Sequence, residues 1–169
     1  MVCLMKKVLI YTDGSSRGNP GPGGYGAILL SGEHQKEQSG GYKETTNNRM
    51  ELMAVIVALE ALRVPCVVEV ISDSRYVINA MDKGWIHAWR QKGWAKADKK
   101  PLKNTDLWKR VYDAMQIHEV KWTWVKGHAG NKYNERCDEL ATSAALGENL
   151  LVDEGFGMDG GEPDLFGAK

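Results

Sequence analysis

Four acidic residues lie next to segments of the sequence that are predicted to be buried: Asp13, Glu51, Asp73 and Asp138. Carboxylates that converge in a partly buried place repel one another and lose hydration, so they need either protons or a cation. Oxygen ligands without histidine or thiolate favour Mg²⁺ or Mn²⁺ over zinc. The acids therefore indicate a candidate site for a divalent metal ion.

Asp13 and Asp73 each follow an apolar run with the composition of a β-strand. The run Val8–Tyr11 ends two residues before Asp13. The run Val67–Ile71 ends two residues before Asp73, and its nearly unbroken apolar pattern is typical of a strand covered on both faces. If the two strands are adjacent and parallel, both acids emerge in the crevice beyond the carboxyl ends, where α/β sheets bind ligands. Taken singly, each acid could also be a turn former.

Glu51 lies near the start of a predicted amphipathic helix. The apolar residues of this helix recur at intervals of three and four: Met50, Met53, Ala54, Val57, Ala58 and Ala61. Asn48, three residues before Glu51, resembles the first residue of a capping box. Glu51 is therefore either a ligand at the border of a buried face or a helix cap.

Asp138 lies on a second predicted helix, next to Cys137 and three residues before Ala141. Residues spaced in this way share one side of a helix, so Asp138 borders a buried face. An ion pair with Arg136 or Lys132 is the alternative role.

Hydrophobic periodicity predicts the elements that must position these acids. Six glycines among residues 14–26, together with Pro20 and Pro22, predict a tight loop between the first two strands. The polar third strand is expected at an edge of the sheet. In chain order the prediction is strands at 8–11, 25–30 and 34–42, a helix from 45 that ends before Pro65, a strand at 67–71, helices at 74–81 and 105–117, a strand at 120–125 and a helix at 134–146. This order is typical of an α/β sandwich with a mixed sheet.

Charge is segregated along the chain although the formal net charge is zero. Met81–Arg110 holds nine Lys or Arg against three Asp, a net charge of +6. A basic block is usually a solvated helix face, but here three tryptophans interleave with cations: Trp85, Trp89, Arg90, Lys92, Trp94 and Lys96. Exposed indole rings among cations suit a nucleic-acid backbone.

At 169 residues the chain suits one domain, which we expect over residues 1–147. Residues 148–169 contain five glycines and six acids against one lysine, which predicts an acidic and mostly disordered tail. The sequence shows neither a membrane span nor an export signal. Three widely spaced cysteines indicate neither a disulfide framework nor a zinc site, so a reducing cytoplasm is expected. A monomer is the default expectation.

Several motifs resemble bacterial ribonuclease HI, and they occur in the order of that family between Met5 and Gly147. The motifs are Tyr-Thr-Asp-Gly-Ser at 11–15, Gly-Asn-Pro-Gly-Pro-Gly-Gly-Tyr-Gly at 18–26, Thr-Asn-Asn-Arg-Met-Glu-Leu at 46–52, Ser-Asp-Ser at 72–74, Val-Lys-Gly-His-Ala-Gly at 125–130 and Asn-Glu-Arg-Cys-Asp-Glu-Leu-Ala at 134–141. The resemblance implies a ribonuclease H-like α/β fold, a five-stranded mixed sheet flanked by helices.

The resemblance also implies an activity. A ribonuclease H is expected to hydrolyse the RNA strand of an RNA/DNA hybrid with two Mg²⁺ ions, for which Mn²⁺ can substitute, and to leave 5′-phosphate and 3′-hydroxyl ends. The four carboxylates would hold the ions. His128 would assist proton transfer or product departure, a role that suits an imidazole.

The same resemblance implies two surfaces for the hybrid. The RNA strand is expected near Ser16, Asn19, Asn47 and Asn48, where amides can meet 2′-hydroxyl groups. The DNA strand is expected against Thr46 and a protruding basic handle: Trp85, Trp89, Lys92, Trp94, Lys96, Lys99 and Lys100. Because phosphate contacts dominate, binding should weaken with salt.

Two features depart from the family pattern. Arg75 stands where relatives usually carry a neutral residue, and the acidic tail has no counterpart. The tail string Asp164-Leu165-Phe166 could dock a protein partner, although a solubilising extension is the simpler interpretation. Two other functions stay open: a DNA-directed metal nuclease of the same wider fold, and a hybrid-binding module without catalysis.

Overall fold

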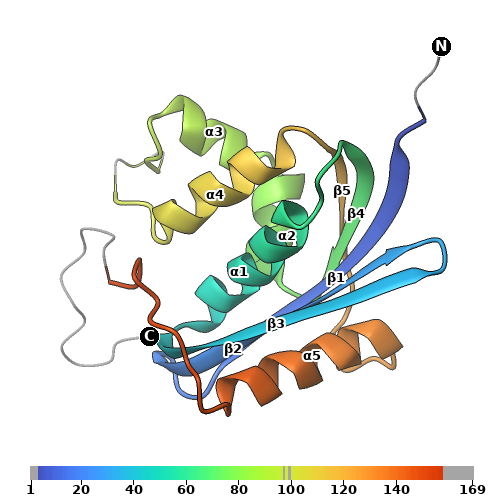
Figure 1. Ribbon diagram of the computed structural model, residues 1–169. Helices are drawn as coiled ribbons and strands as arrows, with labels where there is room; N and C mark the ends of the chain where they lie inside the picture. Colours follow the sequence, from blue (N-terminus) through green and yellow to red (C-terminus); the bar gives the residue numbers. More distant parts are fainter. Residues whose placement is uncertain (1–3, 97, 99, 158–169) are drawn as a thin grey trace.

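The strands and helices follow the predicted order along the chain, with one additional helix in the basic tryptophan segment, α3, that was not predicted. The computed structural model describes residues 4–96, 98 and 100–157. Its elements are β1 (Lys6–Ser16), β2 (Gly21–Ser31), β3 (His34–Thr45), α1 (Asn47–Glu60), β4 (Cys66–Ser72), α2 (Arg75–Asp82), α3 (Trp85–Gln91), α4 (Thr105–Met115), β5 (Glu119–Trp124) and α5 (Lys132–Ala145). The strand order is β3-β2-β1-β4-β5, with β3 at an edge (Figure 1). The predicted α/β fold with a five-stranded mixed sheet is confirmed.

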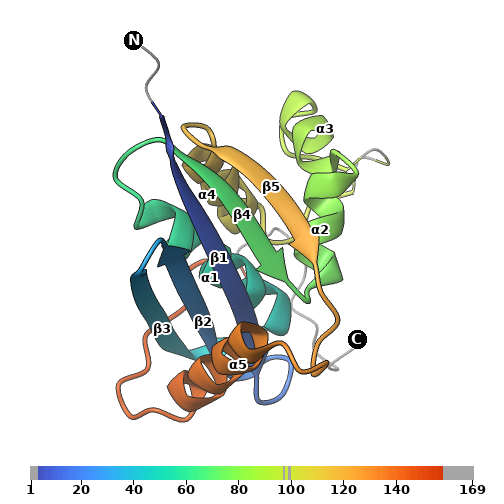
Figure 2. The same cartoon turned by 90° about the vertical axis from the view of Figure 1, so that its right-hand side faces the viewer.

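The sheet is mixed because β1 changes the direction of pairing. β1 pairs antiparallel with β2 and parallel with β4, and β4 pairs parallel with β5. Figure 2 shows α5 in front of the sheet and α1 and α4 behind it. Both faces of β1 are therefore covered, which explains the apolar composition of the central strands.

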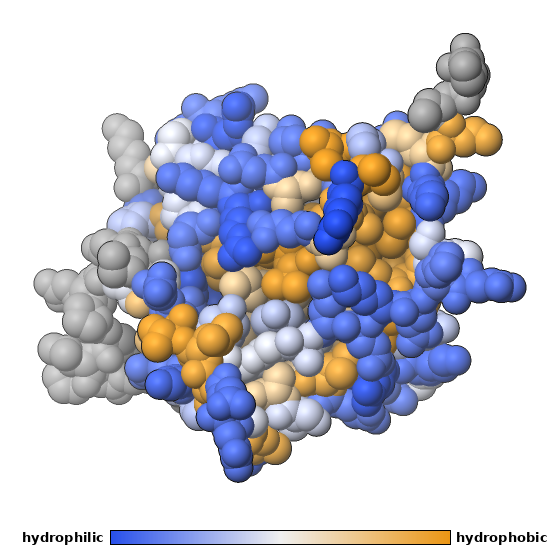
Figure 3. All heavy atoms as spheres, in the orientation of Figure 1, coloured by the Kyte–Doolittle hydropathy of each residue, from blue (hydrophilic) through white to orange (hydrophobic). Residues whose placement is uncertain are grey.

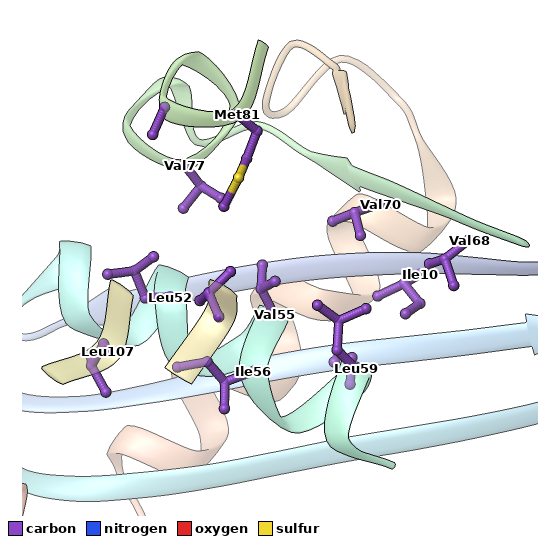
Figure 4. Packing of buried hydrophobic residues seen from close by; sticks show 14 of the residues in the cluster. Ile10, Leu52, Val55, Ile56, Leu59, Val68, Val70, Val77, Met81 and Leu107 are labelled. Carbon is purple, nitrogen blue, oxygen red and sulfur yellow. The ribbon is translucent and has the colours of Figure 1, made fainter. Parts of the chain in front are cut away.

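The main core lies between the sheet and α1. Val55 and Leu59 of α1 lie close to Ile10 of β1, and all three side chains are at most 1% exposed (Figure 4). Burying an aliphatic side chain of this size stabilises the fold by about 1.5–3 kcal/mol. This packing fixes α1 against the strand that carries Asp13. Within the described ranges, the structure has no helix long and apolar enough to cross a bilayer.

The glycine-rich segment does not form the loop expected over residues 14–26. β1 runs on to Ser16 and β2 begins at Gly21, so most of these glycines lie inside strands. A Cβ on Gly24 would collide with the backbone of Ala141, and one on Gly26 would collide with the backbone of Cys137. The missing side chains let α5 pack directly on β2, a tertiary reason that the local pattern does not reveal.

Residues 148–157, the first part of the predicted tail, are hydrogen-bonded to the edge of the sheet. The backbone N–H of Leu151 donates to the carbonyl oxygen of Gly41 at 2.9 Å, and Lys43 N–H donates to Leu151 oxygen at 2.8 Å. The segment thereby pairs with part of the exposed edge of β3, where unpaired backbone groups would otherwise face solvent. The rest of the predicted tail, with the string Asp164–Phe166, lies outside the described residues.

Residues 148–157 are also bound to the start of α1. Arg49 is 1% exposed and makes two hydrogen bonds with Asp153, from Nε at 2.7 Å and from Nη2 at 2.9 Å. Its guanidinium also binds Asp106 of α4, at 2.9 and 2.7 Å. A buried cation needs such partners, so the acid in the C-terminal segment completes the charge balance of α1.

Candidate active site

Asp13 and Asp73 lie side by side beyond the last parallel pair of β1 and β4. That pair joins Thr12 to Ser72, so each acid is the next residue on its strand. The backbone N–H of Gly14 donates to Asp13 Oδ1 at 2.9 Å. The predicted strand-end geometry is confirmed, with the difference that β1 continues past Asp13 in its pairing with β2.

Glu51 reaches the same place from α1. A Cβ on Gly14 would collide with the backbone of Met50 and Glu51, so the glycine lets the first part of α1 lie directly on β1. Carboxylate oxygens of Asp13, Glu51 and Asp73 all lie within 4.8 Å of one another. The helix is capped by Thr46, whose Oγ1 accepts from Arg49 N–H at 3.2 Å. The predicted capping box of Asn48 and Glu51 is therefore wrong, and Glu51 is not used as a cap.

The three carboxylates carry an electrostatic cost. Burial and the neighbouring Asp73 raise the pKa of Asp13 to about 7. Burial, followed by the charges of Asp13 and Asp73, raises the pKa of Glu51 well above its usual range. Glu51 Oε2 is buried and has no hydrogen-bond partner among the residues that the structure describes. A buried carboxylate with an oxygen that has no partner, grouped with two further carboxylates, is the arrangement expected of divalent-cation ligands, so the residues fit such an ion.

Asp138 lies near this group without belonging to the set of three. Its charge contributes to the raised pKa of Asp13, after burial and Asp73. Arg136 is paired with Glu37 and Glu139 instead of Asp138. Lys132 lies over the ring of Tyr133, 5.0 Å from its centroid. The alternative of an ion pair for Asp138 is therefore not observed in the described part of the chain.

The loop that follows β5 brings His128 toward the cluster. A Cβ on Gly127 would lie 2.6 Å from Asp73 Oδ2, so the backbone of this loop rests against the carboxylate. His128 is exposed and has a φ of 55°. The imidazole is thus solvent-accessible and one residue from a direct contact with the site.

Three of the residues predicted to contact RNA are joined by hydrogen bonds. Ser16 N–H donates to Asn47 Oδ1 at 2.6 Å, and Asn47 N–H donates to Asn19 Oδ1 at 3.1 Å. The amide nitrogens of both asparagines have no hydrogen-bond partner within the described chain. The turn between β1 and β2 is therefore fastened to the start of α1, with two amide donors left available.

Some residues of the predicted handle line a pocket on the surface, and others pack inside the handle. A pocket of about 290 Å³, here named the tryptophan groove, is lined among others by Asn48, Arg75, Trp85, Trp89 and Lys96. Trp85 is 43% exposed, and its ring centroid lies 6.5 Å from that of Trp89. Hydrophilic side chains dominate the visible surface over α3 and α4 (Figure 3).

Three other predicted handle residues, Lys92, Trp94 and Lys100, are not among the residues that line the tryptophan groove. Trp94 is half-buried and packs edge-on against Tyr112, with 5.8 Å between the ring centroids. Lys92 and Lys100 are exposed, and Lys100 lies 3.9 Å from Asp98. Lys99 lies outside the described residues. Trp94 is thus mainly a packing residue of the handle.

Comparison with known proteins identifies the family. A model of the RNase H family matches residues 5–146. The chain belongs to the ribonuclease H family. The ribonuclease H of Pseudoalteromonas atlantica is 58% identical over 152 residues, which cover 90% of this chain and 99% of that protein. The ribonuclease H of Escherichia coli O127:H6 is 56% identical over 156 residues, with 92% and 99% covered.

Solved ribonuclease H structures have the same fold. LC9-RNase H1, a type 1 RNase H with the type 2 active-site motif, superposes with a TM-score of 0.78 at 32% identity, covering 88% of this chain and 76% of that one. LC11-RNase H1 in complex with RNA/DNA hybrid gives a TM-score of 0.63 at 28% identity, with 82% and 96% covered. These likenesses confirm the predicted ribonuclease H-like fold and the predicted class of enzyme.

One residue beside this ribonuclease H site was missed by reasoning from the sequence. Trp124 ends β5 and pairs with Ser72, and its Nε1–H donates to the carbonyl oxygen of Asp73 at 3.1 Å. Its place was predictable in principle, because β5 lies parallel to β4 and both strands end at the same edge. The pattern of β5 alone gave no reason to single it out.

Proposed function

We propose that this chain is an endoribonuclease that hydrolyses the RNA strand of RNA/DNA hybrids and leaves 5′-phosphate and 3′-hydroxyl ends. The observation that carries the proposal is the group of Asp13 on β1, Glu51 on α1 and Asp73 directly after β4 in a ribonuclease H fold. A similar protein has been solved in complex with an RNA/DNA hybrid, which supports the choice of substrate.

The proposed ions are two Mg²⁺, with Mn²⁺ as a substitute, held by Asp13, Glu51, Asp73 and Asp138. When bound, such ions activate the attacking water and stabilise the departing 3′ oxygen. The carboxylates themselves are held in place before any ligand arrives, since β1, β4 and α1 are packed against one another. Four negative charges also balance two divalent ions, which would remove the repulsion that raises the pKa of Asp13 and Glu51.

His128 is proposed to assist proton transfer or product departure. Its exposure leaves the imidazole free to exchange protons with solvent, and Gly127 keeps the loop close to Asp73. The role is auxiliary, because the carboxylates lie together without any contribution from the histidine.

Recognition of the RNA strand is proposed for Ser16, Asn19, Asn47 and Asn48. The side-chain amide nitrogens of Asn19 and Asn47 can donate to 2′-hydroxyl oxygens or to oxygens at the edges of the bases. Only the 2′-hydroxyl distinguishes RNA from DNA, because deoxyribose lacks it. Asn48 is exposed and lines the tryptophan groove. The RNA-reading groups and the groove therefore meet at the start of α1.

Recognition of the DNA strand is proposed for Trp85 and Trp89 of the tryptophan groove and for the cations of the predicted handle. Trp85 and Trp89 offer apolar surface to deoxyribose, and Lys96, Lys92, Lys99 and Lys100 supply positive charge. Thr46 is proposed to contact a phosphate. Its oxygen accepts from Arg49 in the helix cap, which leaves its O–H as the available donor.

A monomer in the cytoplasm is the proposed working state. The described cysteines, Cys66 and Cys137, are free and buried, in keeping with a reducing compartment.

The deciding experiment offers the purified protein three duplexes with Mg²⁺: RNA/DNA hybrid, double-stranded DNA and double-stranded RNA. We expect cleavage of the RNA strand of the hybrid alone, with products that carry 5′-phosphate and 3′-hydroxyl ends. Cleavage of duplex DNA at a matching rate would favour a DNA-directed nuclease. Binding of the hybrid without any product would favour a binding module.

A further inference from the structure

Arg75 is a cation two residues from Asp73, and the proposed function gives it no role. It is the first residue of α2 and follows Asp73 by two positions. Its guanidinium carbon lies 4.0 Å from the centroid of the Trp124 ring. The same indole donates its Nε1–H to the carbonyl oxygen of Asp73 at 3.1 Å. Trp124 thus holds the Arg75 side chain against the strand end that carries a metal-ligand candidate.

Arg75 has no carboxylate partner among the residues that the structure describes. The six salt bridges found among the described residues do not include it. A cation in the first turn opposes the helix dipole, so α2 gains no stability from its charge. The residue is also exposed, which removes a role in the core. Its charge is therefore available for a ligand.

The position of Arg75 links the carboxylates to the tryptophan groove. Arg75 lines that groove together with Asn48, Trp85 and Lys96. A guanidinium held over an indole ring by a cation–π contact can still use its N–H donors, and this planar fork matches the oxygens of a phosphate. A lysine at the same place would keep the charge but lose both the stacking and the fork.

We propose that Arg75 binds a backbone phosphate of the RNA strand next to the bond that is cleaved, and so positions the hybrid over the carboxylates. This inference rests on the proposed function. The cleaved bond belongs to the RNA strand and must lie at Asp13 and Asp73, so the phosphates nearest to Arg75 are the neighbours of that bond. Arg75 acts in binding, and it does not touch the reacting atoms.

The first test measures the dissociation constant for an RNA/DNA hybrid in chelator over a range of salt concentrations. Arg75→Gln is expected to weaken binding about three- to tenfold at low salt and to lower the slope of log K against log salt by about one. Arg75→Lys should keep the slope but recover only part of the affinity. The matched control is Arg63→Gln, an exposed arginine beyond the opposite end of α1, which should bind as the wild type does.

The second test assigns the strand. An uncharged methylphosphonate linkage is placed beside the cleavage site, either in the RNA strand or opposite it in the DNA strand. The difference in affinity between wild type and Arg75→Gln should vanish only when the RNA strand carries the neutral linkage. Disappearance with the DNA-strand linkage would overturn the assignment.

Two further outcomes would overturn the proposal. One is an unchanged affinity and salt slope in Arg75→Gln. The other is a fall in kcat with unchanged affinity, which would mean that Arg75 acts on the carboxylates. Failure of the proposed function is distinguishable from these results, because the wild type would then not cleave the hybrid at all.

Discussion

At the scale of single residues, Asp13 and Glu51 bind protons more tightly in the folded chain than in the unfolded one. Burial is the main cause, and the neighbouring carboxylates add to it. The pKa of Asp13 rises from 3.8 to about 7. As pH increases between these two values, the unfolded chain gives up its proton first, so the folded metal-free protein loses stability.

Asp13→Asn tests this reasoning, since it removes one negative charge from the cluster. In chelator at pH 8 the variant should melt at a higher temperature than the wild type, and the difference should shrink toward pH 5. Mg²⁺ should raise the melting temperature of the wild type much more than that of the variant. Thermal denaturation followed by circular dichroism checks both points, with Asp113→Asn, an exposed acid on α4, as the control. A difference between the two melting temperatures that does not grow from pH 5 to pH 8 in chelator would refute the account.

The residues of the site were not equally predictable. Asp13 and Asp73 followed from the rule that parallel strands end at one edge of a sheet, and the structure places them there. The prediction of Glu51 as a site residue depended on which side of its helix is buried and on the family resemblance. Because Gly14 has no side chain, α1 can lie directly on β1 at this point. The local sequence pattern does not predict how closely the helix approaches the strand.

At the scale of elements, the C-terminal segment supports the helix that carries Glu51. Asp153 binds Arg49, two residues before Glu51, and also accepts from Thr45 Oγ1 at 2.6 Å. Its side chain is 9% exposed and that of Arg49 is 2% exposed. Arg49 and Asp153 are 104 residues apart in the sequence. The acidic composition of the C-terminal segment therefore could not show that Asp153 pairs with an arginine of α1.

Asp153→Ala should destabilise the protein by about 1–3 kcal/mol, because it leaves a buried guanidinium with one carboxylate fewer. The change in unfolding free energy can be measured by urea denaturation in Mg²⁺. Glu37→Ala, which removes the carboxylate of an exposed arginine pair, is the control and should change stability little. Equal effects of the two substitutions would mean that the buried contact is not a support.

At the scale of the whole molecule, α1 connects the carboxylates with the cationic handle, because it carries Glu51 and also Asn48, which lines the tryptophan groove. The basic segment Met81–Arg110 provides α3 and part of α4, whereas the acids come from β1, α1, the residue after β4, and α5. The segregation of charge was visible in the sequence. What it did not show is that Trp94 packs against Tyr112 while Trp85 and Trp89 line the groove, since that division depends on where the handle folds back.

The central claim is that Asp13, Glu51 and Asp73 act together in metal-dependent hydrolysis of the hybrid. The most direct measurement is the rate of hybrid cleavage at saturating Mg²⁺ by the wild type and by Asp13→Asn, Glu51→Gln and Asp73→Asn, each first shown to be folded. Every substitution should lower kcat by at least about 10³-fold, which corresponds to roughly 4 kcal/mol of lost transition-state stabilisation. A variant that kept more than about a tenth of the wild-type rate, which is a loss of less than about 1.4 kcal/mol, would contradict the claim.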